Sequence, residues 1–121
     1  MLVVDDHEDS RDLVAMVLGA AGALVSQATS AAEALAELER ECFALLVSDI
    51  GMPESDGYEL LRRIRLTSAT SSHHLPAIAL TAFCTAEDRR RALSAGFQEH
   101  MGKPFDPHEL IEISARLIGR H

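Results

Sequence analysis

The sequence is poor in lysine, tryptophan and cysteine, and these shortages restrict what the protein can be. Lys103 is the only lysine among 11 basic residues, which are outnumbered by 19 acidic ones. The net charge of −8 argues against general binding to nucleic acids or to anionic membrane surfaces. The two cysteines, Cys42 and Cys84, form no CxxC motif and cannot build a disulfide framework, so we expect a reducing, cytoplasmic setting.

Long apolar runs are absent as well. No stretch approaches the roughly 20 apolar residues of a membrane-spanning helix, and the N-terminal residues do not resemble a signal peptide. A length of 121 residues suffices for one domain with a real core but not for two. Because the first expected strand begins almost at Met1, we expect residues 1–121 to be a single domain excised from a longer chain.

The sequence does contain a regular alternation of two hydrophobic periods. Five short apolar runs predict strands, and between them apolar residues recur at helical spacing. Ser30 and Glu33 form a capping box, and Asp106-Pro107 is a typical helix start. Five consecutive strand–helix units predict an α/β fold, a doubly wound five-stranded parallel sheet with helices on both faces. The expected strands are residues 2–4, 23–28, 44–48, 76–80 and 97–102.

Polar residues of complementary chemistry follow four of these strands. Asp5 and Asp6 end the first strand, Asp49 the third, Thr81 the fourth and Lys103 the fifth. Parallel strands present their carboxyl ends at one edge of the sheet, where ligands bind. A single aspartate there is commonly just a turn residue that bonds to nearby backbone amides. Four such clusters at four strand ends instead favour a functional site.

The chemistry of this set indicates phosphoryl transfer. Three neighbouring carboxylates repel one another, so they share protons or bind a cation. Oxygen ligands suit Mg²⁺, which proteins usually hold with one or two carboxylates, water and phosphate oxygens. A lysine and a threonine can then neutralise and hydrogen-bond a phosphoryl group. An aspartate can accept that group as an acyl phosphate, and the reaction needs mainly positioning and electrostatic stabilisation.

Four motifs together resemble the receiver domain of bacterial two-component response regulators. They are MLVVDD at 1–6, DxxMPxxDG at 49–57, LTA at 80–82 and KPF at 103–105. The resemblance extends to the C-terminus and implies a flavodoxin-like (βα)5 fold with strand order 2-1-3-4-5. Residues 95–110 are most similar to receivers fused to hybrid sensor histidine kinases.

The resemblance implies a role for each matching residue. Asp49 would be the phosphoacceptor, and the donor would be a phosphohistidine on a histidine kinase or a histidine phosphotransfer domain. Asp6 would bind Mg²⁺ directly and Asp5 largely through water. Asp49 and the backbone carbonyl of Gly51 would complete the protein's share of the metal shell.

Other residues would bind the phosphate or respond to it. Lys103 would pair with the acceptor carboxylate and then with the phosphate, and Thr81 would bond a phosphoryl oxygen. In the family a cis peptide typically precedes the proline that follows this lysine. His100 stands where the family usually has a rotating tyrosine or phenylalanine. It is either a switch residue, made pH-sensitive by its imidazole, or a half-buried strand histidine.

Two residues bear on how long the phosphate would last. In the family the side chain two residues after the acceptor helps to set the rate of acyl phosphate hydrolysis, and Gly51 has none. Phe83 is bulky enough to shield the phosphate from water. The sequence therefore predicts a long-lived phosphorylated form. His7 follows the acidic pair and could touch the rim of the site, but no role is assigned to it.

Two other functions stay open. A Mg²⁺-dependent phosphatase or phosphotransferase of the haloacid-dehalogenase kind also uses an aspartate nucleophile, but it needs a second carboxylate where this chain has Gly51. A docking module that is never phosphorylated would have no need of Asp49, Thr81 and Lys103. Nucleotide binding is disfavoured, because there is no GxGxxG motif and GKP at 102–104 lacks the rest of a P-loop.

Overall fold

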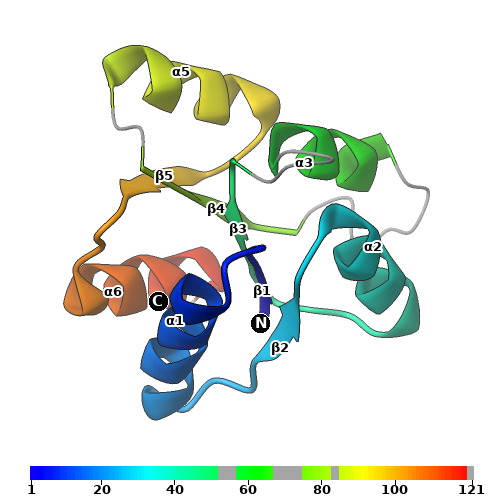
Figure 1. Ribbon diagram of the computed structural model, residues 1–121, viewed down its shortest axis with the longest axis vertical. Helices are drawn as coiled ribbons and strands as arrows, with labels where there is room; N and C mark the ends of the chain where they lie inside the picture. The colour runs from blue at the N-terminus through cyan, green and yellow to red at the C-terminus, as the bar shows by residue number, and fades with distance from the viewer. Residues whose placement is uncertain (52–56, 67–74, 83–84, 120–121) are drawn as a thin grey trace.

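The computed structural model describes residues 1–51, 57–66, 75–82 and 85–119. Five parallel strands form one sheet in the order β2-β1-β3-β4-β5 with helices on both faces (Figure 1), which confirms the expected doubly wound, flavodoxin-like fold. None of the described helices is both long and apolar enough to cross a membrane. The strands are β1 (Leu2–Val4), β2 (Ser26–Ala28), β3 (Leu46–Asp49), β4 (Ala77–Thr81) and β5 (Glu99–Gly102). The helices are α1 (Glu8–Ala20), α2 (Ala31–Arg40), α3 (Gly57–Leu66), α5 (Ala86–Ala95) and α6 (Pro107–Leu117).

Four strands begin one to three residues later than predicted, and for β2 and β5 the reason is that the residues before them complete the preceding helix. The strand expected from residue 23 begins at Ser26, since the amide of Ala23 donates a 3.1 Å hydrogen bond into the last turn of α1. The strand expected from residue 97 begins at Glu99. There the amide of Phe97 donates back to α5 at 3.1 Å, just after the left-handed glycine that ends this helix.

Each central strand contributes side chains to two separate cores. In β1, Leu2 and Val4 pack in the core formed with α2, α3 and α5, whereas Val3 packs in the core formed with α1 and α6. In β3, Leu46 and Val47 divide between the same two cores. Parallel strands that are covered on both faces read as unbroken apolar runs, which explains the sequence pattern.

Three helices begin at residues whose side chains cap them, among them Ser30 and Asp106, which the sequence indicates, and one does not. The hydroxyl of Ser30 accepts a 3.2 Å hydrogen bond from the amide of Glu33 at the start of α2. Thr85 caps α5 and Asp106 caps α6 in the same way. The N-cap of α1 is His7, whose side chain makes no capping hydrogen bond. Helix capping therefore does not explain a histidine at this position.

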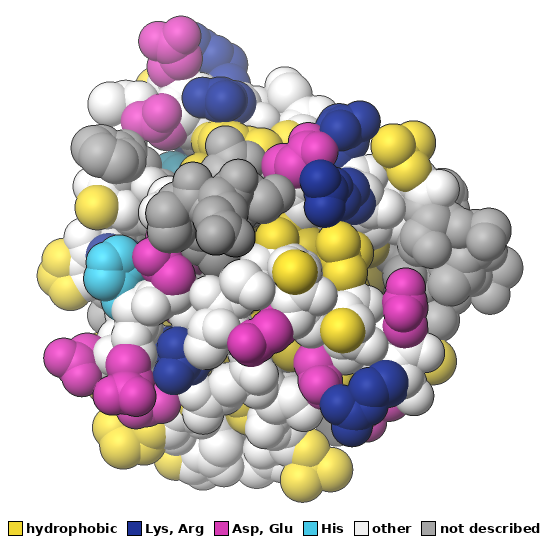
Figure 2. All heavy atoms as spheres, turned by 45° about the vertical axis from the view of Figure 1, so that its right-hand side comes forward, with side chains coloured by type: hydrophobic (Ala, Val, Ile, Leu, Met, Phe, Trp, Pro, Cys, Tyr) yellow, Lys and Arg dark blue, Asp and Glu magenta, His cyan; other side chains and the backbone are white. Residues whose placement is uncertain are grey.

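Arg40 on α2 and Arg62 and Arg63 on α3 are paired with carboxylates about one helical turn away. Arg40 lies 2.7 Å from Glu37, and Glu59 contacts both Arg62 at 2.7 Å and Arg63 at 3.3 Å. Figure 2 shows basic and acidic side chains next to one another on this side of the molecule. The described residues of this face thus form no broad cationic surface of the kind that nucleic acids contact.

Gly57, the last residue of the DxxMPxxDG motif, begins α3 in direct contact with the end of β3. A Cβ atom at this position would lie 2.7 Å from the carbonyl oxygen of Asp49 and 3.1 Å from the Cα of Ile50. The amide of Gly57 also donates to the Ile50 carbonyl at 3.0 Å. The contact leaves no room for a side chain, so glycine is required here for packing.

We predict that Gly57→Ala lowers the free energy of unfolding by about 1–3 kcal/mol, the usual cost of overpacking. Gly19→Ala is the matched control, because a Cβ there meets no atom within 4 Å. This exposed position in α1 should gain roughly 0.5–1 kcal/mol from better helix propensity. Urea unfolding of both variants measures the difference, and equal effects would contradict the packing argument.

Candidate functional site

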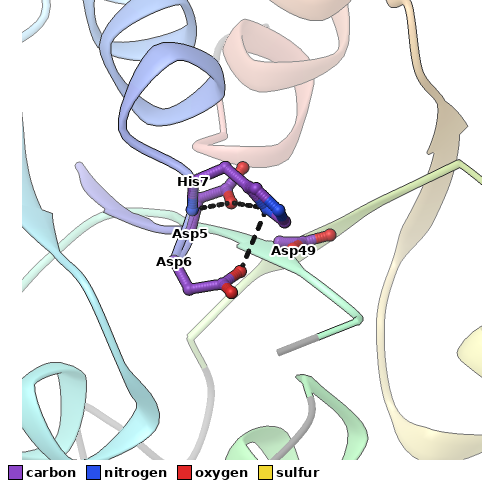
Figure 3. A group of neighbouring side chains, drawn as sticks. All are labelled: Asp5, Asp6, His7 and Asp49. Atoms are coloured by element: carbon purple, nitrogen blue, oxygen red, sulfur yellow. Dashed lines mark hydrogen bonds and ion pairs between the residues drawn. The ribbon is translucent and has the colours of Figure 1, made fainter. Parts of the chain in front are cut away.

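The site lies at the carboxyl ends of the central strands, as the topology requires. Val4 of β1 pairs with Ser48 of β3, so the residues that follow them, Asp5 and Asp49, are neighbours across the strands. Figure 3 shows the side chains of Asp5, Asp6, His7 and Asp49 gathered at this edge of the sheet. The three aspartates that the sequence singles out are therefore brought together.

Asp49 is a buried carboxylate at the end of β3, with only 6% of its surface exposed. One of its oxygens, Oδ1, lies 3.3 Å from the Nζ atom of Lys103. The amide of Gly51 donates to the same oxygen at 3.4 Å. The carboxylate is thus fixed in orientation and paired with the ammonium group of Lys103, although it is almost completely removed from solvent.

Lys103 reaches a second carboxylate as well. Its Nζ atom donates to Oδ2 of Asp5 at 3.1 Å, which is a shorter contact than the one to Asp49. The sequence predicts only the pair with the acceptor carboxylate. The backbone holds the lysine in place, because its amide donates to the carbonyl of Thr81 at 2.8 Å. The Lys103–Pro104 peptide is cis, as the resemblance implies.

The pKa values of the two buried aspartates shift in opposite directions. Burial raises the pKa of Asp5, but hydrogen bonds from the His7 amide, from Ser10 and from Lys103 outweigh it, so the pKa lies below its ordinary value. For Asp49, burial and then the charge of Asp5 raise the pKa, and the contacts with Lys103 and Gly51 only partly oppose this. Asp49 is therefore the more basic carboxylate, which makes it the better nucleophile.

Asp6 and His7 form the outer side of the cluster. The Nδ1 atom of His7 lies 3.2 Å from Oδ1 of Asp6 and 3.5 Å from Oδ1 of Asp5. The His7 amide donates to Asp5 at 2.9 Å. Sequence reasoning places this histidine at the rim without a role, and the only signal for it is its position directly after two aspartates.

The cluster fits a divalent cation. Asp5, Asp6, His7 and Asp49 each offer one ligand atom, and these atoms lie within 4.8 Å of one another. Oδ1 of Asp6 is buried and receives no hydrogen bond from the described residues, which is costly for a carboxylate oxygen unless a cation replaces the donor. Three carboxylates face one ammonium here, so a cation would relieve their repulsion.

The other residues that the sequence predicts for the site do not all belong to the acidic cluster. Thr81 is buried at the end of β4, opposite Gly102 and tied to Lys103. Gly51 is exposed beside Asp49, and a side chain added to it would meet no atom within 4 Å. His100 is buried in β5 and lines a hollow between α5 and α6, outside the acidic cluster. Phe83 lies outside the described residues.

Comparison with known proteins points to one family. Residues 1–115 match the family model of the response regulator receiver domain. The chain is 51% identical over 113 residues to an uncharacterized 14.6 kDa protein of Leptolyngbya boryana, and the match covers 93% of this chain and 85% of that protein. It is 38% identical over 104 residues to the sensor histidine kinase RcsC of Salmonella typhimurium, where it covers 86% of this chain but only 10% of the kinase.

Solved structures give the same result. The receiver domain of NtrX from Brucella abortus has a TM-score of 0.87 to this chain at 30% identity, with 99% of this chain and 98% of that one covered. In this chain the acidic cluster lies at the carboxyl edge of the five-stranded sheet. The chain belongs to the family of response regulator receiver domains, the phosphoacceptor signalling switches of two-component systems.

Proposed function

We propose that Asp49 is the phosphoacceptor of this receiver, and that its donor is a phosphohistidine on a histidine kinase or on a histidine phosphotransfer domain. The observation that carries the proposal is the pairing of a buried carboxylate of raised pKa with the only lysine of the chain, at 3.3 Å. A carboxylate that is both basic and fixed in orientation is prepared for nucleophilic attack.

In the transfer, an oxygen of Asp49 attacks the phosphorus atom while the bond from phosphorus to the donor imidazole breaks. The electron pair of that bond stays on the imidazole nitrogen of the donor. The imidazole then exchanges protons with water, so that the donor becomes neutral histidine. Lys103 neutralises charge on the acceptor and then on the phosphoryl oxygens. Asp5 keeps Lys103 in position through the 3.1 Å hydrogen bond.

Asp5, Asp6, Asp49 and the carbonyl of Gly51 are the residues that would hold Mg²⁺. When bound, Mg²⁺ would neutralise the phosphoryl oxygens and the crowded carboxylates. The buried Oδ1 atom of Asp6, which receives no hydrogen bond from the described residues, and the excess of carboxylates over ammonium groups support this assignment.

The response to phosphorylation would involve Thr81 and His100. The hydroxyl of Thr81 would bond a phosphoryl oxygen, and the backbone link from Lys103 to Thr81 keeps both phosphate-binding residues in one rigid unit. His100 would be the switch residue of β5. Its place in the hollow beside α5 and α6 supports a role on that surface.

We also propose a cellular location and a chain context for the domain. We place it in the cytoplasm, where reducing conditions suit the exposed thiol of Cys42. The relatives include both a 14.6 kDa protein and the long kinase RcsC. We propose that residues 1–121 act as a single receiver domain in a chain that extends further, as in a hybrid histidine kinase.

We predict that incubation with Mg²⁺ and acetyl phosphate produces a single acid-stable, base-labile phosphate on the protein, and that Asp49→Asn abolishes it. Intact-mass spectrometry measures the modification. Asp12→Asn, which removes an exposed carboxylate from α1, is the control and should be phosphorylated like the wild type. Phosphate on the Asp49→Asn protein at the wild-type rate would assign the acceptor elsewhere.

The phosphorylated form should be long-lived, because Gly51 places no side chain beside the acceptor and Phe83 is expected to shield the phosphate. Loss of phosphate is followed after the phosphodonor is removed. Gly51→Asn should change the rate without unfolding the protein, since the space at this position is open. Decay of the wild-type phosphate within seconds would contradict the prediction.

Asp49 should also destabilise the fold when no cation is bound. A carboxylate whose pKa is raised on folding stabilises the protein only while it is protonated, and this contribution is lost as the pH rises through the raised pKa. Asp49→Asn should therefore increase the free energy of unfolding at neutral pH without Mg²⁺. The gain should vanish when the pH falls below the ordinary aspartate pKa of about 3.9.

Urea unfolding with and without Mg²⁺ provides the measurement. Mg²⁺ should stabilise the wild type more than Asp49→Asn, because ligand binding stabilises the state that binds it. Asp12→Asn serves again as the control, with no pH-dependent gain. A neutral-pH stability of Asp49→Asn below that of the wild type would show that Asp49 is not electrostatically strained.

A further inference from the structure

Among the described residues, His7 is the one histidine that belongs to the acidic cluster, and no role follows for it from folding. It occupies the N-cap of α1, yet its side chain makes no capping hydrogen bond. The side chain is 70% exposed, so it contributes little to either core. The hydrogen bond that does support the site comes from the His7 amide, which any residue except proline would supply.

The position of the imidazole is nevertheless specific. Its Nδ1 atom lies 3.2 Å from Oδ1 of Asp6 and 3.5 Å from Oδ1 of Asp5. Figure 3 shows the ring projecting over the carboxylates toward Asp49. The Oδ1 atom that faces the imidazole in Asp6 is the same buried oxygen that receives no hydrogen bond from the described residues.

These atoms together form a mixed ligand set. One nitrogen and three carboxylate oxygens lie within 4.8 Å of one another, a spread that a single ion can draw together. Mg²⁺ strongly prefers oxygen and gains little from imidazole, whereas Co²⁺, Ni²⁺ and Zn²⁺ bind imidazole well. Their affinity for nitrogen and oxygen sites is also higher in general.

We propose that Nδ1 of His7 is a direct ligand for late first-row divalent ions in the acidic cluster, so that this receiver binds Co²⁺-like ions through nitrogen as well as Mg²⁺ through oxygen. The inference rests on the proposed function, because it places the ion in the pocket that surrounds Asp49. Its consequence is a metal preference set by His7 within the phosphoacceptor site.

The test compares the affinities for Co²⁺ and Mg²⁺ by isothermal titration calorimetry in the wild type, His7→Ala and His108→Ala. His108 is also exposed at the start of a helix, so it controls for surface histidines that bind Co²⁺ on their own. The Co²⁺-to-Mg²⁺ affinity ratio should fall in His7→Ala by about tenfold or more, since even indirect supports of metal ligands are worth 10–100-fold. It should stay at the wild-type value in His108→Ala.

A second measurement reports on the ligand atom. In imidazole ¹⁵N NMR spectra, the Nδ1 resonance of His7 should shift on addition of Zn²⁺ but not of Mg²⁺, and Asp49→Asn should weaken this shift. An unchanged affinity ratio in His7→Ala, or a Zn²⁺ shift at Nε2 alone, would overturn the inference.

Failure of the inference is distinguishable from failure of the proposed function. If acetyl phosphate and Mg²⁺ phosphorylate Asp49 while the metal preference is independent of His7, only the inference is wrong. If Mg²⁺ and Co²⁺ do not compete and Asp49→Asn changes the binding of neither ion, the metal site of the proposed function is refuted along with it.

Discussion

The site depends on one ammonium group placed between two buried carboxylates. The Nζ atom of Lys103 lies 3.1 Å from Oδ2 of Asp5 and 3.3 Å from Oδ1 of Asp49. Without it, two negatively charged carboxylates that are almost removed from solvent would face each other. Burying a charge is tolerable only when it is paired and hydrogen-bonded. The pairing is unequal, because Asp5 has further hydrogen bonds and Asp49 has the raised pKa. Of these two carboxylates, Asp49 is the one whose charged form the fold stabilises less, and it is therefore the one better suited to react.

The parallel sheet makes this arrangement possible. Asp5 and Lys103 are 98 residues apart in the sequence, yet both follow strands that end at the same edge. The backbone amide of Lys103 donates a hydrogen bond to the Thr81 carbonyl, which fixes the backbone from which the lysine side chain starts, so that only the side-chain rotamer remains to be selected. Precise placement of a long, flexible side chain therefore comes from backbone pairing.

Much of this could be predicted from the sequence. The apolar runs and helical periods gave the sheet and its partners, and the polar residues at the strand ends gave the cluster, because both follow from local patterns. The starts of β2 and β5 could not be predicted, since hydrogen bonds back to the preceding helix decide them. The pair between Lys103 and Asp5 and the approach of His7 also depend on side-chain geometry across strands, which no local pattern encodes.

The close contact at Gly57 has a mechanical consequence. With no Cβ to act as a spacer, the backbone at the start of α3 lies directly against the peptide of Asp49, and a 3.0 Å hydrogen bond joins it to the next residue of the strand. A shift of the Asp49 peptide cannot be absorbed by side-chain rotation at this point. The end of β3 and the first turn of α3 are therefore in direct backbone contact, so a movement of the backbone at Asp49 would displace the start of that helix.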